Sequence, residues 1–340
     1  GMTGPPGRAD MVTLADLTRV SLRIGLLSFG GPAAQIALMH RELVETRKWL
    51  SEKEYLNALS FCMLLPGPEA MQLATYAGWK LRGVPGGLIA GGLFVIPGAI
   101  VIAALATIYA WYGQVPLVAA LFLGVQATVV VIVVEALLRV AKRALSGPGH
   151  WVIAALAFLA IFALHLPYPL IVIAAGLWGM MTARGDVGVA PPRARANTPV
   201  TVVIWGASWG APLALLVALD ATLLVEVGVF FSKLAVVTFG GAYAVLAYMT
   251  LAVVEDFGWL TLPQMIDGLG LAETTPGPLI LVTEFVGFLA GYREGGLGLA
   301  FAAAVVTLWM TFVPCFLWIF TGAPYIDWIA TRPRLSGALR

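Results

Sequence analysis

The sequence predicts an all-α polytopic membrane protein made of two homologous repeats. Of its 340 residues, 60% are hydrophobic and only 11% are charged, whereas about a quarter of the residues of soluble domains are charged. Several apolar stretches are long enough to cross about 30 Å of hydrocarbon as helices. Because lipid offers the backbone no hydrogen bonds, helices are the favoured architecture.

The repeats follow from an internal duplication with a constant offset of 210 residues. Three separated motifs recur in this register without a gap, which chance rarely produces. Transporters are commonly built from two such repeats around a central site. The motifs and their counterparts are Ser28-Phe29-Gly30-Gly31 with Thr238-Phe239-Gly240-Gly241, Trp49-Leu50 with Trp259-Leu260, and Pro66-Gly67-Pro68 with Pro276-Gly277-Pro278.

About eleven apolar segments follow one another along the chain. Two of them, 55–82 and 263–291, contain the Pro-Gly-Pro motifs, and 151–165 and 167–183 are short for full crossings. The remaining segments are 13–38, 85–112, 116–139, 200–219, 222–250, 296–320 and a start near 325. We therefore expect a first repeat domain at 12–183, a linker at 184–199, a second repeat domain at 200–325 and a tail at 326–340.

Each Pro-Gly-Pro motif is expected to break a membrane helix into two halves. Proline lacks a backbone donor, glycine allows unusual dihedral angles, and Pro68 or Pro278 suits the start of a new helix. A broken helix presents the positive end of its dipole and free N–H groups, which can bind an oxyanion. The alternative is a mere kink at a helix crossing, which two copies in one register disfavour. The Gly-Gly pairs predict a second pair of breaks or close-packing points.

The membrane topology depends on how the Pro-Gly-Pro segments run. If each crosses once, an odd number of spans separates the repeats, and the repeats are antiparallel. If each is a re-entrant hairpin, the number is even and the repeats are parallel. The distribution of Lys and Arg does not decide between the two, because either topology gathers most of them on one side. We prefer single crossings, since inverted repeats give alternating access by exchanging two near-equivalent arrangements.

The motifs resemble those of the chromate transporter family over roughly residues 15–325. The resemblance is carried by Ser28-Phe29-Gly30-Gly31-Pro32 with Gln35, then Trp49-Leu50, then Leu65-Pro66-Gly67-Pro68-Glu69-Ala70 with Ala74-Thr75-Tyr76-Ala77-Gly78. Thr275-Pro276-Gly277-Pro278-Leu279 with Glu284-Phe285-Val286-Gly287-Phe288 resembles the family's second domain.

This resemblance implies a multi-pass permease of the bacterial inner membrane that confers chromate resistance. It implies export of chromate from the cytoplasm by two halves of opposite orientation, driven by the proton motive force. Long members of the family continue with further membrane segments beyond the position of Pro324, so the helix count of this chain stays open.

Chromate is a tetrahedral dianion, and its site needs cations or N–H donors in a partly dry cavity. Arg23 and Lys233 are repeat equivalents, each seven residues before a Gly-Gly pair, although both could instead reach the lipid headgroups. Thr75 could donate a hydrogen bond. The candidate substrate-binding residues are Arg23, Lys233, Gly30, Gly31, Gln35, Pro66, Gly67, Pro68, Thr75, Gly240, Gly241, Pro276, Gly277 and Pro278.

Coupling to protons needs a carboxylate or histidine held in the membrane. Glu69 directly follows the first Pro-Gly-Pro motif, where the helix dipole favours a negative charge. Glu273 precedes the second motif by three residues, and Glu284 follows it within two turns. Glu69 has a competing structural explanation as a helix cap.

Other classes of protein fit the sequence less well. An ATP-driven pump needs a GxxxxGK[ST] loop, which is absent, and the three histidines are too scattered for a membrane enzyme. We expect no enzyme activity, cofactor or metal. The expected partners are chromate or a sulfate-like oxyanion and the lipid bilayer, without nucleic acid, and a homodimer is left open. A sulfate permease and an anion channel remain alternatives.

Overall fold

The computed structural model describes residues 12–124, 147–162, 198–239 and 245–326, with single positions between 127 and 181. Every regular element within these residues is a helix. Gly240 and Gly241, most of the linker 184–199 and the tail from 327 onward lie outside the described residues, so the domain boundaries stay predictions.

The two repeats fold into the same succession of elements. The first contains α2 (Leu14–Leu27), α3 (Pro32–His40), the π-helical turn η1 (Arg41–Thr46), α4 (Glu52–Leu64) and α5 (Glu69–Tyr112). The second contains α10 (Thr222–Val237), α11 (Leu246–Thr250), the π-helical turn η3 (Leu251–Asp256), α12 (Leu262–Thr274), the 3-10 turn η4 (Leu279–Leu281), α13 (Val282–Gly322) and η5 (Ala323–Tyr325). Between them lie α7 (Pro148–Phe162) and α9 (Thr198–Ala218).

Local sequence explains why α4 and α12 begin where they do. Ser51 and Thr261 form capping boxes with Glu54 and Gln264, in which each side chain bonds the backbone N–H of the other residue. This pattern satisfies N–H groups that a helix start leaves free. Because the boxes also lie 210 residues apart, the duplication extends to the way in which these helices begin.

The long helices α5 and α13 each double back on themselves. Gly83 (φ 68°) and Gly296 (φ 80°) have dihedral angles that no helix adopts. A Cβ on Gly91 would collide with Thr75 Oγ1, although sixteen residues of straight helix would separate the two by about 24 Å. The arms before and after Gly83 therefore pack side by side, and the contact of Gly287 with Thr307 shows the same reversal in α13.

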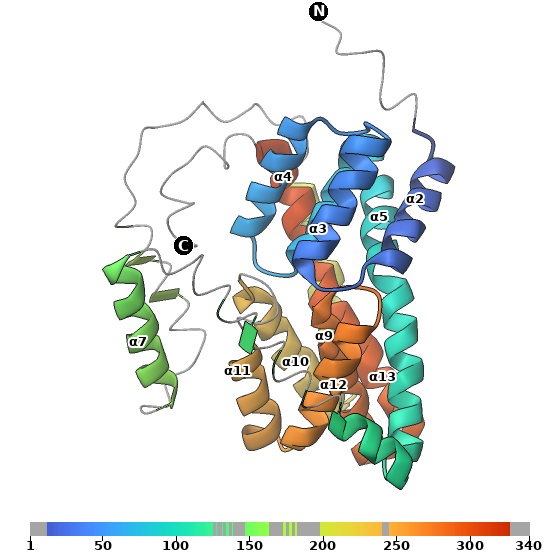
Figure 1. Ribbon diagram of the computed structural model, residues 1–340, viewed down its shortest axis with the longest axis vertical. Coiled ribbons are helices and arrows are strands. Elements are labelled where there is room, and N and C mark those ends of the chain that lie inside the picture. The colour runs from blue at the N-terminus through green and yellow to red at the C-terminus, as the bar shows by residue number, and fades with distance from the viewer. Residues whose placement is uncertain are drawn as a thin grey trace, which may run out of the picture.

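The remaining helices of each repeat are half-length and gather at one end of the molecule. Val12 and Leu17 of the first repeat pack with Leu81 and Trp49, so the start of α2, the start of α4 and the end of the first arm of α5 meet at what we call the first-repeat end. Figure 1 shows α2, α3 and α4 in one half of the molecule and α10, α11 and α12 in the other, with α5 and α13 running between them.

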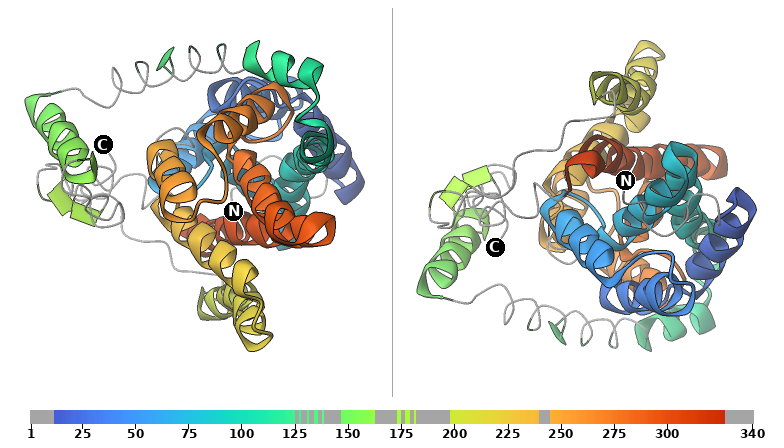
Figure 2. Two further views of the ribbon diagram at one scale, coloured as in Figure 1. Left: turned by 90° about the horizontal axis from the view of Figure 1, so that it is seen from below. Right: turned by 90° about the horizontal axis from the view of Figure 1, so that it is seen from above.

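The opposite end is formed by the second repeat. Tyr109 near the end of α5, Thr261 at the start of α12 and Tyr292 of α13 line one cavity there, and we call this the second-repeat end. The second arm of α5 thus runs from one end to the other, over about 40 Å from Val84 to Tyr112. Seen along the molecule in Figure 2, these helices surround a common centre, with α9 on the outside.

Reciprocal hydrogen bonds join the repeats where their helices break. The N–H of Gly67 donates to the carbonyl of Thr238 at 2.6 Å, and the N–H of Gly277 donates to the carbonyl of Ser28 at 2.9 Å. Since Gly277 and Thr238 are the counterparts of Gly67 and Ser28, each bond becomes the other when the repeats are exchanged. Such reciprocity is typical of a two-fold relation.

The topology differs from the single crossings that we expected for the Pro-Gly-Pro segments. Lys80 Nζ lies 4.0 Å from Glu54 Oε2, so the arm that follows the motif returns to the end where α4 began. With 13 residues, α4 extends about 20 Å and cannot cross the hydrocarbon alone. The Gly-Gly break likewise separates α2 from α3, and His40 at the end of α3 contacts Glu52 at the start of α4, so segment 13–38 is also a hairpin. The spans expected between the repeats are then 85–112, 116–139, 151–165, 167–183 and 200–219. Their number is again odd, as antiparallel repeats require.

Within the part of the chain that the structure describes, three stretches are long and apolar enough to span a membrane: Glu69–Tyr112, Thr198–Ala218 and Leu279–Tyr325. Large apolar side chains also point outward, such as Ile100 and Leu117. A surface of this kind suits contact with lipid tails.

Candidate functional site

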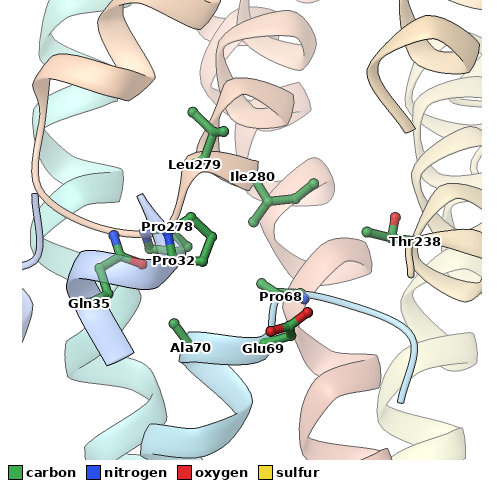
Figure 3. Close-up of a pocket in the computed structure, with 9 residues that line it drawn as sticks. All are labelled: Pro32, Gln35, Pro68, Glu69, Ala70, Thr238, Pro278, Leu279 and Ile280. Carbon is green, nitrogen blue, oxygen red and sulfur yellow. The ribbon is translucent and has the colours of Figure 1, made fainter. Parts of the chain in front are cut away.

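A cavity lies at the centre, where the broken helices of both repeats meet (Figure 3). Its volume is about 20 Å³, which leaves room for about one water molecule. An oxyanion with five heavy atoms therefore requires the cavity to widen. The lining residues are Pro32, Gln35, Pro68, Glu69, Ala70, Thr238, Pro278, Leu279 and Ile280.

Three helix starts point at this central cavity. Pro32 begins α3, Glu69 begins α5, and Leu279 begins the turn η4 that leads into α13. Each break places a proline at or just before the first helical position, which fixes where the helix starts. The first N–H groups of a helix have no partner within it and carry its positive dipole end. Helix starts from both repeats thus create a positive potential at one point.

The buried side chain of Gln35 forms hydrogen bonds with both repeats at the centre. Its side chain is 1% exposed, and its Nε2 donates to the carbonyl of Gly277 at 2.8 Å and to that of Ser28 at 3.2 Å. These bonds tie the first Gly-Gly break to the second Pro-Gly-Pro motif. Its Oε1 has no hydrogen-bond partner among the described residues, so an acceptor remains beside the cavity.

We predict that Gln35→Ala lowers the thermal stability of the protein. The variant leaves the carbonyl of Gly277 without its side-chain donor, and an unsatisfied buried polar group costs about 1–3 kcal/mol. A melting curve of purified protein measures the effect, and Gln114→Ala, at an exposed turn, is the control. Equal melting temperatures for both variants would contradict the role of Gln35.

The candidate coupling residues lie in different surroundings. Glu69 lines the central cavity at the start of α5. Glu284, in the first turn of α13, is 1% exposed, and its Oε1 has no partner among the described residues. Glu273 is half-buried on α12, outside the cavity lining. An isolated buried carboxylate is costly, so the neutral acid suits the position of Glu284.

The proposed cations do not line the cavity in this conformation. Arg23 Nε donates to Glu42 Oε1 at 3.1 Å, and Lys233 is exposed on α10. Each lies four residues before the end of a half-helix that leads to the centre. Thr75 is buried between the arms of α5, where its Oγ1 donates to the carbonyl of Met71 at 2.9 Å.

Sequence reasoning missed a buried polar pair between the repeats. Tyr109 on α5 donates its hydroxyl to Asp267 Oδ2 on α12 at 2.6 Å, and Asp267 is 5% exposed. Because the two residues are 158 positions apart, no local sequence pattern predicts that they form a pair. The available hint was that Asp267 aligns with Asn57 at the repeat offset, which places an acid opposite an amide in an otherwise apolar segment. Among the described residues, no group of three His, Cys, Asp or Glu could hold a metal ion.

The sequence is similar to that of known transporters. The family model for chromate transporters matches residues 15–180 and 225–340, two regions that fit the repeat. A probable chromate transport protein of Synechococcus elongatus is 30% identical over 95% of this chain and 79% of its own length. A chromate transport protein of Cupriavidus metallidurans is 31% identical over 96% of this chain and 78% of its own length.

A half-length relative is informative about the duplication. The uncharacterised transporter YwrA of Bacillus subtilis is 32% identical over 45% of this chain, which corresponds to 88% of its own length. A stretch of less than half of this chain therefore corresponds to most of a separate protein. No solved structure matches the chain. The names of these relatives point to transport rather than to catalysis.

Proposed function

We propose that this chain, which belongs to the chromate transporter family, exports chromate or a similar tetrahedral oxyanion from the cytoplasm by alternating access. The observation that carries the proposal is the meeting of three helix starts at one cavity between the repeats. A dianion is stabilised by the positive ends of helix dipoles and by free N–H groups, and this arrangement needs no cofactor.

Alternating access is proposed together with an inverted relation of the two repeats. Two observations support a pseudo-two-fold axis in the membrane plane. The hydrogen bond between Gly67 and Thr238 corresponds to that between Gly277 and Ser28 at the repeat offset. The half-helices of the two repeats also lie at opposite ends of the molecule (Figure 1). An inverted pair can exchange conformations, so that the cavity opens first to one side and then to the other. The small central volume then corresponds to a site that widens during the cycle.

The first-repeat end is proposed to face the cytoplasm of a bacterium, across its inner membrane. Positively charged residues favour the cytoplasmic side of a membrane protein. Among the described residues, the second-repeat end carries Arg293. The described Lys and Arg residues at the first-repeat end are Arg19, Arg41, Arg47, Lys48, Lys53, Lys80 and Arg82.

Flux into liposomes tests the proposed function. The purified chain should transport chromate with saturation, sulfate should compete, and the flux should respond to a membrane potential and to a pH gradient. Saturation distinguishes a carrier from an anion channel. Binding of chromate, sulfate, molybdate and phosphate to the purified protein would identify the substrate, and absence of any saturable oxyanion flux would refute the proposal.

Arg23 and Lys233 are proposed to contact the oxyanion when the cavity widens, since both lie on half-helices that end at it. We predict that Arg23→Gln or Lys233→Gln weakens oxyanion binding by about 1.5–3 kcal/mol, the contribution of a hydrogen bond to a charged group. Titration of sulfate binding measures the effect, with folded yield as the control. Unchanged affinity in both variants would identify the two cations as anchors at the lipid headgroups.

A further inference from the structure

A second, larger cavity lies at the second-repeat end, and we call it the vestibule. Its volume is about 480 Å³, so an oxyanion fits it without rearrangement. The end of α5, the start of α12 and the end of the first arm of α13 form its walls. The lining residues are Tyr109, Ala110, Gly113, Gln114, Trp259, Thr261, Pro263, Gln264, Leu289, Tyr292 and Arg293.

The chemistry of the vestibule favours an anion. Its lining contains a guanidinium, two carboxamides and two phenols, and no carboxylate. Nη1 of Arg293 donates to the carbonyl of Gly258, which anchors the side chain and leaves its other N–H groups for a ligand. The hydroxyl of Tyr109 is engaged by Asp267, so the donors that we assign to the ligand are Arg293, Gln264 and the hydroxyl of Tyr292.

At the first-repeat end, apolar side chains of α2 and α5 meet. There, Leu81, Val12 and Leu17 pack together against Trp49. The counterpart of Gln264 at that end is Glu54, whose carboxylate lies 4.0 Å from Lys80 Nζ. A carboxylate repels an oxyanion, whereas an amide can donate a hydrogen bond to it. The two ends therefore differ in charge at equivalent positions, despite the shared scaffold.

We propose that the vestibule is a second binding site for a tetrahedral oxyanion, with Arg293 as its cation. This inference rests on the proposed function, because the vestibule would hold the oxyanion before or after its passage through the central cavity. Guanidinium groups bind oxyanions through two parallel hydrogen bonds. The site is reached from the side of the membrane opposite to the end where most of the described Lys and Arg residues lie.

Protection of an introduced thiol tests the site. Cys62 and Cys315 are free and buried, so Gln114→Cys adds a readily labelled thiol at an exposed position of the vestibule. Labelling of the full chain with a charged maleimide is followed with and without sulfate, at constant ionic strength. Sulfate serves as the probe because chromate oxidises thiols. Thr46→Cys, exposed beside Arg47 and Lys48 at the other end, is the matched control.

We expect sulfate to slow labelling of Gln114→Cys at least threefold and to leave Thr46→Cys unaffected. Adding Arg293→Gln should raise the sulfate concentration for half-protection about tenfold, as loss of a charge-assisted hydrogen bond implies. Labelling that ignores sulfate, in a protein that still transports oxyanions, would overturn the vestibule site alone. Protection that persists unchanged in the Arg293→Gln background would also overturn it. Protection dependent on Arg293 in a protein without oxyanion transport would support the site and refute the proposed function.

Discussion

Gly277→Ala should reduce oxyanion transport more than tenfold and lower the yield of folded protein. Gly277 has φ of 99°, which costs a residue with a side chain about 1–3 kcal/mol. A Cβ there would lie 2.9 Å from Leu281 Cδ1 and 3.3 Å from Gly98 Cα. Its N–H and carbonyl also bond to Ser28 and Gln35, so any shift disturbs both contacts between the repeats.

Gly258→Ala is the matched control for backbone strain. Gly258 has φ of 64°, its counterpart Lys48 carries a side chain at φ of 53°, and a Cβ on Gly258 would meet nothing within 4 Å. It should therefore reduce flux much less than Gly277→Ala. Liposome flux and chromatographic monodispersity measure both variants. Equal effects would mean that strain alone, rather than packing between the repeats, explains the loss.

The repeat register was the part of the fold that sequence could predict. The motifs at 28–31, 49–50 and 66–68 set the offset, and the structure extends it to elements without an evident motif. The π-helical turns Arg41–Thr46 and Leu251–Asp256 and the helices Glu52–Leu64 and Leu262–Thr274 obey the same offset. Prolines and glycines have local conformational effects, so the positions of the breaks could be predicted from the sequence.

The direction of the chain after each break could not be predicted in this way. The Pro-Gly-Pro motif at 66–68 separates the end of α4 from the start of α5, but whether the second helix continues or returns depends on packing between distant residues. Here it returns along α4, where Lys80 lies beside Glu54. The chain reverses again at Gly83, where small residues let the arms of α5 approach closely, as at Gly78 with Gly86. Similarly, no local pattern pairs Tyr109 with Asp267 or brings Gln35 to Gly277.

Repeats with one scaffold and different polar side chains give a transporter two ends with different affinities. Asn57 and Asp267, Glu54 and Gln264, and Gln35 and Val245 occupy equivalent positions with different charge or polarity. Because the repeats share one backbone arrangement, two conformations of similar energy are expected. The differences in polar side chains then let the anion or a proton bind one of these conformations more tightly. Coupling is therefore sought among carboxyl groups that one repeat has and the other lacks.

Glu69 is such a group, since its counterpart is Leu279 and both residues line the central cavity (Figure 3). An ionised Glu69 would repel a dianion there, whereas a protonated Glu69 would not, so proton and anion binding favour each other. A chromate dianion leaving with one proton still removes one net negative charge, which the membrane potential favours by about 2.3 kcal/mol per 100 mV. Where the outside is more acidic, each pH unit opposes the exit of that proton by about 1.4 kcal/mol.

Glu69→Gln should therefore retain oxyanion binding and lose the response of transport to pH. The amide keeps the shape of the side chain but cannot release a proton, so flux in liposomes should no longer rise when the loading side is made acidic. Glu284→Gln is the comparison, because Glu284 is buried after the equivalent break of the second repeat but does not line the cavity. If the Glu69→Gln variant responds to an imposed pH gradient as the parent does, Glu69 only caps its helix. The coupling group must then be Glu284 or Glu273, which the same measurement on Glu284→Gln would separate.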